Sequence, residues 1–185
     1  MSEYQALGGT IRKFWPGEMG AFRDHLLRLD AESRRLRFGG ITSDAFIEDY
    51  CETARRLGTV VYAYFMDTRP VAVAEMRWLF DHHPVEAEVA ITVELPYRDQ
   101  GIGSALMGRI IKAARNRHVR KLHMICLAEN VRMQQVARKH RALLVCEHGS
   151  ISGELDPAHP TPFTLWLEGL DEGSGYIAAV THAFP

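Results

Sequence analysis

The segment from Glu88 to Ser104 constrains the fold most, because an apolar run meets a glycine-rich turn there and a helical pattern follows. Residues 89–93 are small or β-branched and mostly apolar, which is typical of a strand buried on at least one face. After Gly103 the apolar residues recur at helical spacing. A helix N-terminus exposes unpaired N–H groups that can bind an anion, and glycines let a ligand approach the backbone closely. The segment therefore predicts a strand, a phosphate-binding turn and a helix in succession.

The turn itself reads RDQGIG from Arg98 to Gly103. It lacks the G-x-G-x-x-G spacing of dinucleotide folds and the Gly-Lys-Ser/Thr ending of a P-loop. A lone R-x-x-G-x-G more often marks an ordinary turn, so the segments around it decide its meaning. Downstream, the sequence predicts a second strand from Lys121 to Leu127, then Ala128-Glu129-Asn130 and a helix through Met133 and Ala137.

In this combination the chain resembles the GNAT acyl-CoA-dependent acetyltransferases, whose pyrophosphate loop has the pattern Q/R-x-x-G-x-G/A. The resemblance covers about Val60 to Val145, and the earlier helices more loosely. Three sequence segments are most similar to those of the Pat-type protein lysine acetyltransferases, namely AEVA at 87–90, LAENVRM at 127–133 and ESRRLRF at 32–38. The resemblance implies an α/β fold with a mixed, mostly antiparallel central sheet, flanking helices, and a cofactor cleft between two splayed parallel strands.

The resemblance also implies acetyl-CoA as the cosubstrate. Main-chain groups of Ile91 and Val93 would bond its pantetheine arm, and the glycine-rich loop would hold its pyrophosphate. The residues expected to contact acetyl-CoA are Ile91, Thr92, Val93, Arg98, Asp99, Gln100, Gly101, Ile102, Gly103, Ser104, Asn130 and Met133.

Acetylation of an amine requires a base, because a lysine ammonium has a pKa of about 10.4 and must lose a proton before it attacks a thioester. Glu88 is the expected base, since a glutamate at this position has that role in the Pat-type pattern. Glu86 is the rival, because strand alternation places it on the same face. Both side chains would face solvent if neither is functional. By resemblance, the backbone N–H of Val93 stabilises the oxyanion of the tetrahedral intermediate.

One family feature is missing from the sequence. Many GNAT enzymes place a tyrosine seven residues after the asparagine to protonate the departing thiolate, and here that position is Ala137. The Gly-Phe pair that follows in the family is Arg141-Ala142 here, and Tyr97 is not expected to substitute. A thiol has a pKa of about 8.5, so a thiolate can leave without protonation. The change puts the leaving-group step in doubt without excluding activity.

These residues predict an acetyl-CoA-dependent N-acetyltransferase in which an amine, preferably a protein lysine side chain, attacks directly in a ternary complex. A small-molecule amine acetyltransferase is the alternative within the enzyme class. The alternative outside it is a non-catalytic acyl-CoA-binding module that reports to a partner, because a fold and a cofactor site alone do not establish chemistry. Either a monomer or a homodimer is compatible with the sequence.

The remaining pattern predicts the other elements of the fold. Helices are expected to begin near Pro16, Asp30 and Thr42 or Ser43. Short turns between the strands that precede the loop indicate antiparallel pairing. The tail 169–185 has no predicted structure. The expected strands outside the segments above are Thr10 to Phe14, Thr59 to Asp67, Pro70 to Phe80, Val85 to Glu94, and Phe163 to Leu167 as a last strand closing the sheet.

Length and charge agree with one N-acetyltransferase domain over 1–185, with its core at about 10–168. The 185 residues suit a single core, and the formal net charge of −1 offers no global attraction for nucleic acid. The longest apolar run, 60–66, is far shorter than the ~20 residues of a membrane span. Neither nucleic acid nor a membrane is an expected partner.

The cysteines and the N-terminus indicate a cytoplasmic protein. Cys51, Cys126 and Cys146 cannot all pair within one chain, and we expect all three to be reduced and buried. No secretion signal is recognisable at the start of the sequence. No metal site is expected, because His82-His83 lack cysteine or acidic partners at ligand spacing.

Overall fold

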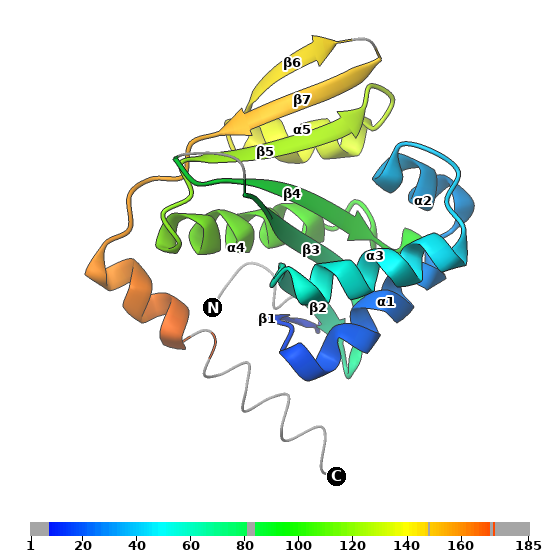
Figure 1. Cartoon of the computed structure of the whole chain (residues 1–185), viewed down its shortest axis with the longest axis horizontal. Helices are drawn as coiled ribbons and strands as arrows, with labels where there is room; N and C mark the ends of the chain where they lie inside the picture. Colours follow the sequence, from blue (N-terminus) through cyan, green and yellow to red (C-terminus); the bar gives the residue numbers. More distant parts are fainter. Residues whose placement is uncertain (1–7, 81–83, 148, 171, 173–185) are drawn as a thin grey trace.

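The computed structural model describes residues 8–80, 84–147, 149–170 and 172. In this part of the chain, seven strands form one sheet in the order β1-β2-β3-β4-β5-β7-β6 (Figure 1). All neighbouring strands pair antiparallel except β4 and β5, which pair parallel. The expected mixed, mostly antiparallel sheet is confirmed. The strands are β1 (Thr10–Lys13), β2 (Val60–Met66), β3 (Arg69–Leu79), β4 (Glu86–Val93), β5 (Lys121–Leu127), β6 (Leu143–Glu147) and β7 (Ser150–Leu155).

Side-chain caps set where several helices begin. Asp30 accepts a hydrogen bond from the backbone N–H of Ser33, and Ser43 accepts one from that of Phe46. The predicted helix starts near Asp30 and Ser43 are therefore confirmed. The helices are α1 (Met19–Arg28), α2 (Ala31–Phe38), α3 (Asp44–Arg56), α4 (Ile102–Asn116) and α5 (Val131–Lys139), with short 3₁₀ turns η2 (Pro16–Glu18) and η3 (Leu95–Tyr97).

Strand β2 is buried on both faces, because successive side chains enter two different apolar cores. Tyr62 and Tyr64 pack in the core that lies against α4. Val61, Ala63 and Phe65 pack in a second core formed with α1 and α3. The centre of the sheet is therefore covered by helices on both sides, which explains why its strands read as continuous apolar runs.

Strands β4 and β5 pair over only a short length. Their ladder joins Glu86, Ala87 and Glu88 to Lys121, Leu122 and His123. Beyond these residues β4 continues beside β3 as far as Val93, whereas β5 diverges from it (Figure 1). The sheet is therefore split between its two parallel strands, as expected.

Residues 162–170 are helical, so the predicted last strand from Phe163 to Leu167 is wrong. The side chain of Thr161 accepts a hydrogen bond from the backbone N–H of Thr164 at 3.3 Å, and Pro162 follows it as the first helical residue. A threonine cap followed by proline is a helix-start signal. This local signal and the contacts of the helix override the apolar run that suggested a strand.

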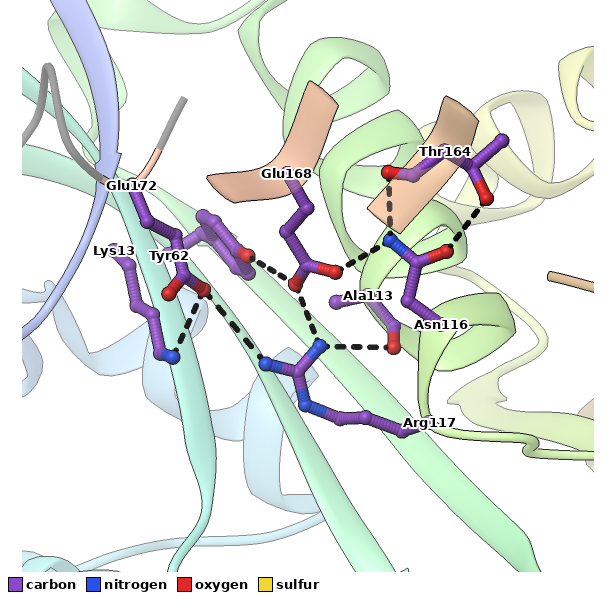
Figure 2. Close-up of polar contacts among 8 residues, drawn as sticks. All are labelled: Lys13, Tyr62, Ala113, Asn116, Arg117, Thr164, Glu168 and Glu172. Carbon is purple, nitrogen blue, oxygen red and sulfur yellow. Dashed lines mark hydrogen bonds and ion pairs between the residues drawn. The ribbon is translucent and has the colours of Figure 1, made fainter. Parts of the chain in front are cut away.

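The 162–170 helix is fixed to the rest of the fold through Glu168 (Figure 2). Its carboxylate accepts hydrogen bonds from Asn116 Nδ2 at 2.5 Å, Arg117 Nη1 at 2.6 Å and Tyr62 Oη at 3.3 Å. Asn116 also donates to the backbone carbonyl of Thr164 at 3.1 Å. The segment thus joins the C-terminal end of α4 to β2.

The β6–β7 hairpin was not predicted from the sequence. It turns at Gly149, which has a φ of 84°, and β7 inserts between β5 and β6. Cys146 lies on β6, the last strand of the sheet, and is exposed, whereas Cys51 and Cys126 are buried. The prediction that all three thiols are buried is therefore wrong for Cys146. Across the described ranges, no helix has the length and apolarity needed to cross a bilayer.

Candidate functional site

A cleft of about 740 Å³ lies where β4 and β5 separate. Strand β4, the loop after it, the first turn of α4, and helices α2 and α5 form its walls. It gathers all the residues predicted to contact acetyl-CoA except Gln100, whose side chain bonds to the Pro96 carbonyl instead. The predicted residues that line the cleft are Ile91, Thr92, Val93, Arg98, Asp99, Gly101, Ile102, Gly103, Ser104, Asn130 and Met133.

Main-chain groups at the end of β4 face the gap between the two strands. The N–H of Glu94 bonds to the carbonyl of Val71 on the β3 side. In an antiparallel ladder the bonding direction alternates from residue to residue, so the main-chain groups of Ile91 and Val93 point the other way. They point past the end of the β4–β5 ladder, into the opening. An extended ligand in the cleft would meet them as an added strand would.

The first turn of α4 presents backbone donors to the same cleft. Gly101 has a φ of 79° and forms the N-cap, and its carbonyl accepts the N–H of Ala105 at 3.0 Å. The N–H groups that precede Ala105 have no partner within the helix, and they lie at the positive end of its dipole. The first turn of α4 holds no acidic side chain. This wall of the cleft therefore favours an anion.

The side chain of Arg98 turns inward, away from the open part of the loop. Its Nε donates to the carbonyl of Val93 at 3.0 Å, and its Nη2 donates to the hydroxyl of Ser33 on α2. Arg98 thus fixes the end of β4 and joins the loop to α2. An anion on this loop would meet its backbone rather than this guanidinium.

A buried histidine holds the opposite side of the end of β4. His25 of α1 is fully buried, with Nε2 at 2.9 Å from Thr92 Oγ1 and Nδ1 at 3.2 Å from Glu94 Oε1. Arg28 also donates to Glu94, at 3.0 Å. Desolvation is the main effect on His25 and lowers its pKa below the ordinary 6.5. One neutral imidazole therefore fixes both side chains that flank Val93.

Glu88 and Glu86 share a face of β4 but have different partners. Glu88 accepts a hydrogen bond from Arg77 on β3 at 3.1 Å, and its side chain is 24% exposed. Glu86 lies 2.6 Å from His123 Nε2 on β5. Glu88 is the last residue of β4 paired with β5, but it is not among the residues that line the cleft. Neither carboxylate is fully exposed, and each is held by a basic side chain of a neighbouring strand.

The segment after β5 forms the far wall. Asn130 caps α5 through a hydrogen bond from the Met133 N–H at 3.2 Å, and both residues line the cleft. Ala137, which replaces the family tyrosine, is fully buried against the core. Tyr97, which was not expected to take part, also lines the cleft.

Several charged residues of the cleft were not predicted as site residues. Arg37 of α2 lines it and forms a buried ion pair with Glu75 of β3, while also donating to Tyr50 Oη at 2.6 Å. Arg132 and Lys139 approach from α5. The arginine-rich segment 32–38 pointed to Arg37. The residues around Arg132 did not distinguish it from an ordinary arginine on a helix surface.

No cluster of three or more histidine, cysteine or acidic side chains suited to a metal ion occurs in the described part of the chain. His82 and His83, where no metal site was expected, lie outside that part.

Comparison with known proteins agrees with this geometry. The model of the Acetyltransferase (GNAT) family matches residues 24–141. A curated relative, Acetyltransferase Pat of Mycolicibacterium smegmatis, is 34% identical over 95 residues, which is 49% of this chain. The match spans only 28% of the length of that relative.

Solved structures share the fold at low sequence identity. The GNAT domain of S. lividans PAT superposes with a TM-score of 0.68 at 20% identity, over 80% of this chain and 90% of that chain. The structure of yncA from Salmonella typhimurium with its cofactor acetyl-CoA superposes with a TM-score of 0.61 at 14% identity, over 83% and 97%. A cAMP-binding acyltransferase from Mycobacterium smegmatis has a TM-score of 0.55 at 23% identity, covering 93% of this chain but 52% of that one.

Proposed function

The chain belongs to the Acetyltransferase (GNAT) family, and on that premise we propose that it transfers the acetyl group of acetyl-CoA to an amine, preferably a protein lysine side chain. The observation that carries the proposal is the cleft at the separation of β4 and β5. It combines main-chain groups of a strand edge with the N-terminus of α4. The first suits an extended pantetheine arm, and the second suits a diphosphate.

In the proposed reaction, Glu88 takes a proton from the acceptor ammonium, directly or through water. The free amine then attacks the thioester carbonyl, and the N–H of Val93 donates to the oxyanion that forms. Collapse of this intermediate breaks the carbon–sulfur bond and releases CoA thiolate, and the attacking nitrogen gives its second proton to water, which leaves the neutral amide. The proposal is a direct transfer in a ternary complex, without an acetylated residue of the protein.

The leaving group needs no tyrosine in this scheme. Ala137 offers no proton. A thiol has a pKa of about 8.5, so its thiolate is an adequate leaving group without protonation. Tyr97 lines the cleft from η3, but the scheme assigns it no proton transfer.

A protein lysine is preferred as acceptor because the curated relative is named Pat and the three matching segments are those of the Pat-type pattern. A small-molecule amine acetyltransferase is the alternative acceptor class. A non-catalytic acyl-CoA-binding module is the alternative without chemistry, and the replaced tyrosine favours it. We further propose that residues 1–185 form one N-acetyltransferase domain with its core at about 10–168, acting in the cytoplasm as a monomer or homodimer.

The test compares Glu88→Gln with Glu86→Gln, measuring CoA release with a single-lysine peptide and with spermidine, and acetyl-CoA binding by calorimetry. Loss of a general base costs about 10²–10⁴ in turnover. We expect Glu88→Gln to lose turnover by that factor and to retain binding. If only Glu86→Gln lost turnover, Glu86 and not Glu88 would be the general base. Saturable binding without turnover of any amine, in wild type, would favour the non-catalytic module.

A further inference from the structure

The phosphate-binding loop of the proposed site contains an acidic residue. Asp99 lies directly after Arg98, lines the cleft, and has a φ of 60°. Its side chain is 65% exposed. A carboxylate at this place would repel the diphosphate of an acyl-CoA unless another charge offset it. The carboxylate of Asp99 therefore opposes the anion binding that the backbone donors of α4 favour.

Arg132 offsets that charge from the other wall of the cleft. Its Nε lies 3.0 Å from Asp99 Oδ1 and its Nη2 lies 3.1 Å from Oδ2, so the pair is bidentate. The hydrogen bonds from Arg132 are also the main cause of the lowered pKa of Asp99, which keeps the carboxylate ionised. Loop and α5 are thus linked by a neutral pair at the edge of the cleft.

The position of Arg132 indicates that it contributes little to the stability of the fold. It is in the first turn of α5, where the helix dipole disfavours a cation. The pair is exposed on both sides, with side chains 61% and 65% accessible, and exposed pairs add little to stability.

The other charges nearby do not replace it. The guanidinium of Arg98 is directed at Val93 and Ser33, and Glu129 is paired with Arg35 at 2.5 Å. Lys139 lines the cleft from the last turn of α5, at the other end of that helix.

We propose that Arg132 is a cosubstrate-affinity residue, which makes the loop able to bind the anionic diphosphate of an acyl-CoA by neutralising Asp99. This inference rests on the proposed function and adds to it a residue outside the loop motif. The net charge of the Asp99–Arg132 pair, rather than either side chain alone, then sets affinity.

The experiment is a double-mutant cycle read by calorimetry with acetyl-CoA, using Asp99→Asn, Arg132→Gln and the double variant. Arg138→Gln, also exposed and on α5 but outside the cleft lining, is the matched control. Net charge predicts that Arg132→Gln weakens binding about three- to tenfold, as expected for one exposed charge near the ligand. Asp99→Asn should bind slightly tighter than wild type, and the double variant should return to within about twofold of it. High salt should reduce these differences.

Two results would overturn the inference while leaving the proposed function intact. One is wild-type affinity in Arg132→Gln. The other is a double variant as weak as Arg132→Gln, because removing Asp99 would then relieve nothing. Absence of saturable binding by folded wild type is a different outcome, since it would overturn the proposed function itself and the inference with it.

Discussion

At the level of single residues, the two glycines before and within the first turn of α4 have different roles. Gly101 has a left-handed φ of 79°, which side chains with a Cβ adopt at a cost. Gly103 is helical, and a Cβ there would lie 3.7 Å from methyl groups of Val93 and Val136, an ordinary contact. Gly101 is therefore needed by the fold, whereas the protein itself has room for a methyl group at Gly103.

We expect Gly101→Ala to lower the free energy of unfolding by about 1–2 kcal/mol, because alanine is strained at this φ. We expect Gly103→Ala to fold normally and to bind acetyl-CoA within about twofold of wild type, because the family pattern Q/R-x-x-G-x-G/A accepts alanine here and the Cβ meets only ordinary contacts. Urea unfolding and calorimetry measure the two effects. Gly108→Ala is the control, since it lies in the same helix with similar room, 3.7 Å from His140 Cε1. A loss of affinity of about tenfold or more in Gly103→Ala would contradict this expectation and would show that the ligand lies too close to the backbone for a methyl group at this residue.

The part of the site that could be predicted is the part encoded in short segments. The loop from Arg98 to Gly103 carries its glycines in sequence, and its backbone role does not depend on distant residues. Arg132 and Tyr97 are different, because their place in the cleft depends on how α5 and η3 pack. Strand alternation also places Glu86 and Glu88 on one face, so the pattern of the strand does not distinguish their partners on β5 and β3.

At the level of elements, the 162–170 helix shows how a polar contact can fix a largely apolar segment. Phe163, Trp166 and Leu170 are each at least half exposed, so burial of these side chains holds the helix only weakly. Glu168 is only 15% exposed and bonds to both α4 and β2 (Figure 2). The run from Phe163 to Leu167 reads equally as strand or helix by apolarity, and Thr161-Pro162 was the signal that distinguished them.

We expect Glu168→Ala to reduce the free energy of unfolding by about 1–3 kcal/mol, since it removes the acceptor of Tyr62 Oη and one of the two acceptors of Asn116 Nδ2. Hydrogen exchange should rise in 162–170 before it rises in β2–β4, because the helix loses its main attachment. Urea unfolding and exchange by mass spectrometry measure both. Glu48→Ala, on the exposed surface of α3, should change stability by less than about 0.5 kcal/mol. Unchanged exchange in 162–170 would show that other contacts hold the helix.

At the level of the whole molecule, β4 connects the parts of the proposed site. One edge pairs with β3, the other opens into the cleft, and one face is fixed by His25 of α1. The order from β2 to β5 was predictable because each of these strands follows its partner through a short turn or one helix, whereas β1 is separated from β2 by three α-helices. The insertion of β7 between β5 and β6 was not predictable, because pairing in that order depends on neighbours distant in sequence.

Because His25 is buried in the folded protein, its protonation is coupled to global unfolding at acid pH. Its pKa is lowered in the folded state, mainly by desolvation, so the unfolded chain takes up a proton near pH 6.5 and the folded chain only at lower pH. The unfolded state therefore binds more protons as pH falls below 6.5, and the free energy of unfolding decreases by up to about 1.4 kcal/mol per pH unit for one such proton. The charged groups that act on the ring are Glu94 and Arg28, and Glu94 is also paired with Arg28 and Arg69.

The uptake of one proton by His25 makes the free energy of unfolding depend on pH between about 6.5 and 5. We expect His25→Gln to remove most of this pH dependence, because glutamine can bond to Thr92 and Glu94 without titrating. Urea unfolding at a series of pH values measures the slope. The variant should retain a smaller dependence of the free energy of unfolding on pH, because the pKa of His140 is also lowered, mainly by desolvation. Glu94, with a pKa lowered by bonds from His25 and Arg28 against the opposing effect of burial, adds acid sensitivity only as pH falls through about 4.5 and below. Exposed His159→Gln should leave the wild-type slope unchanged. An equal slope in His25→Gln and wild type would mean that the buried imidazole is not the group that couples acid to the fold around Val93.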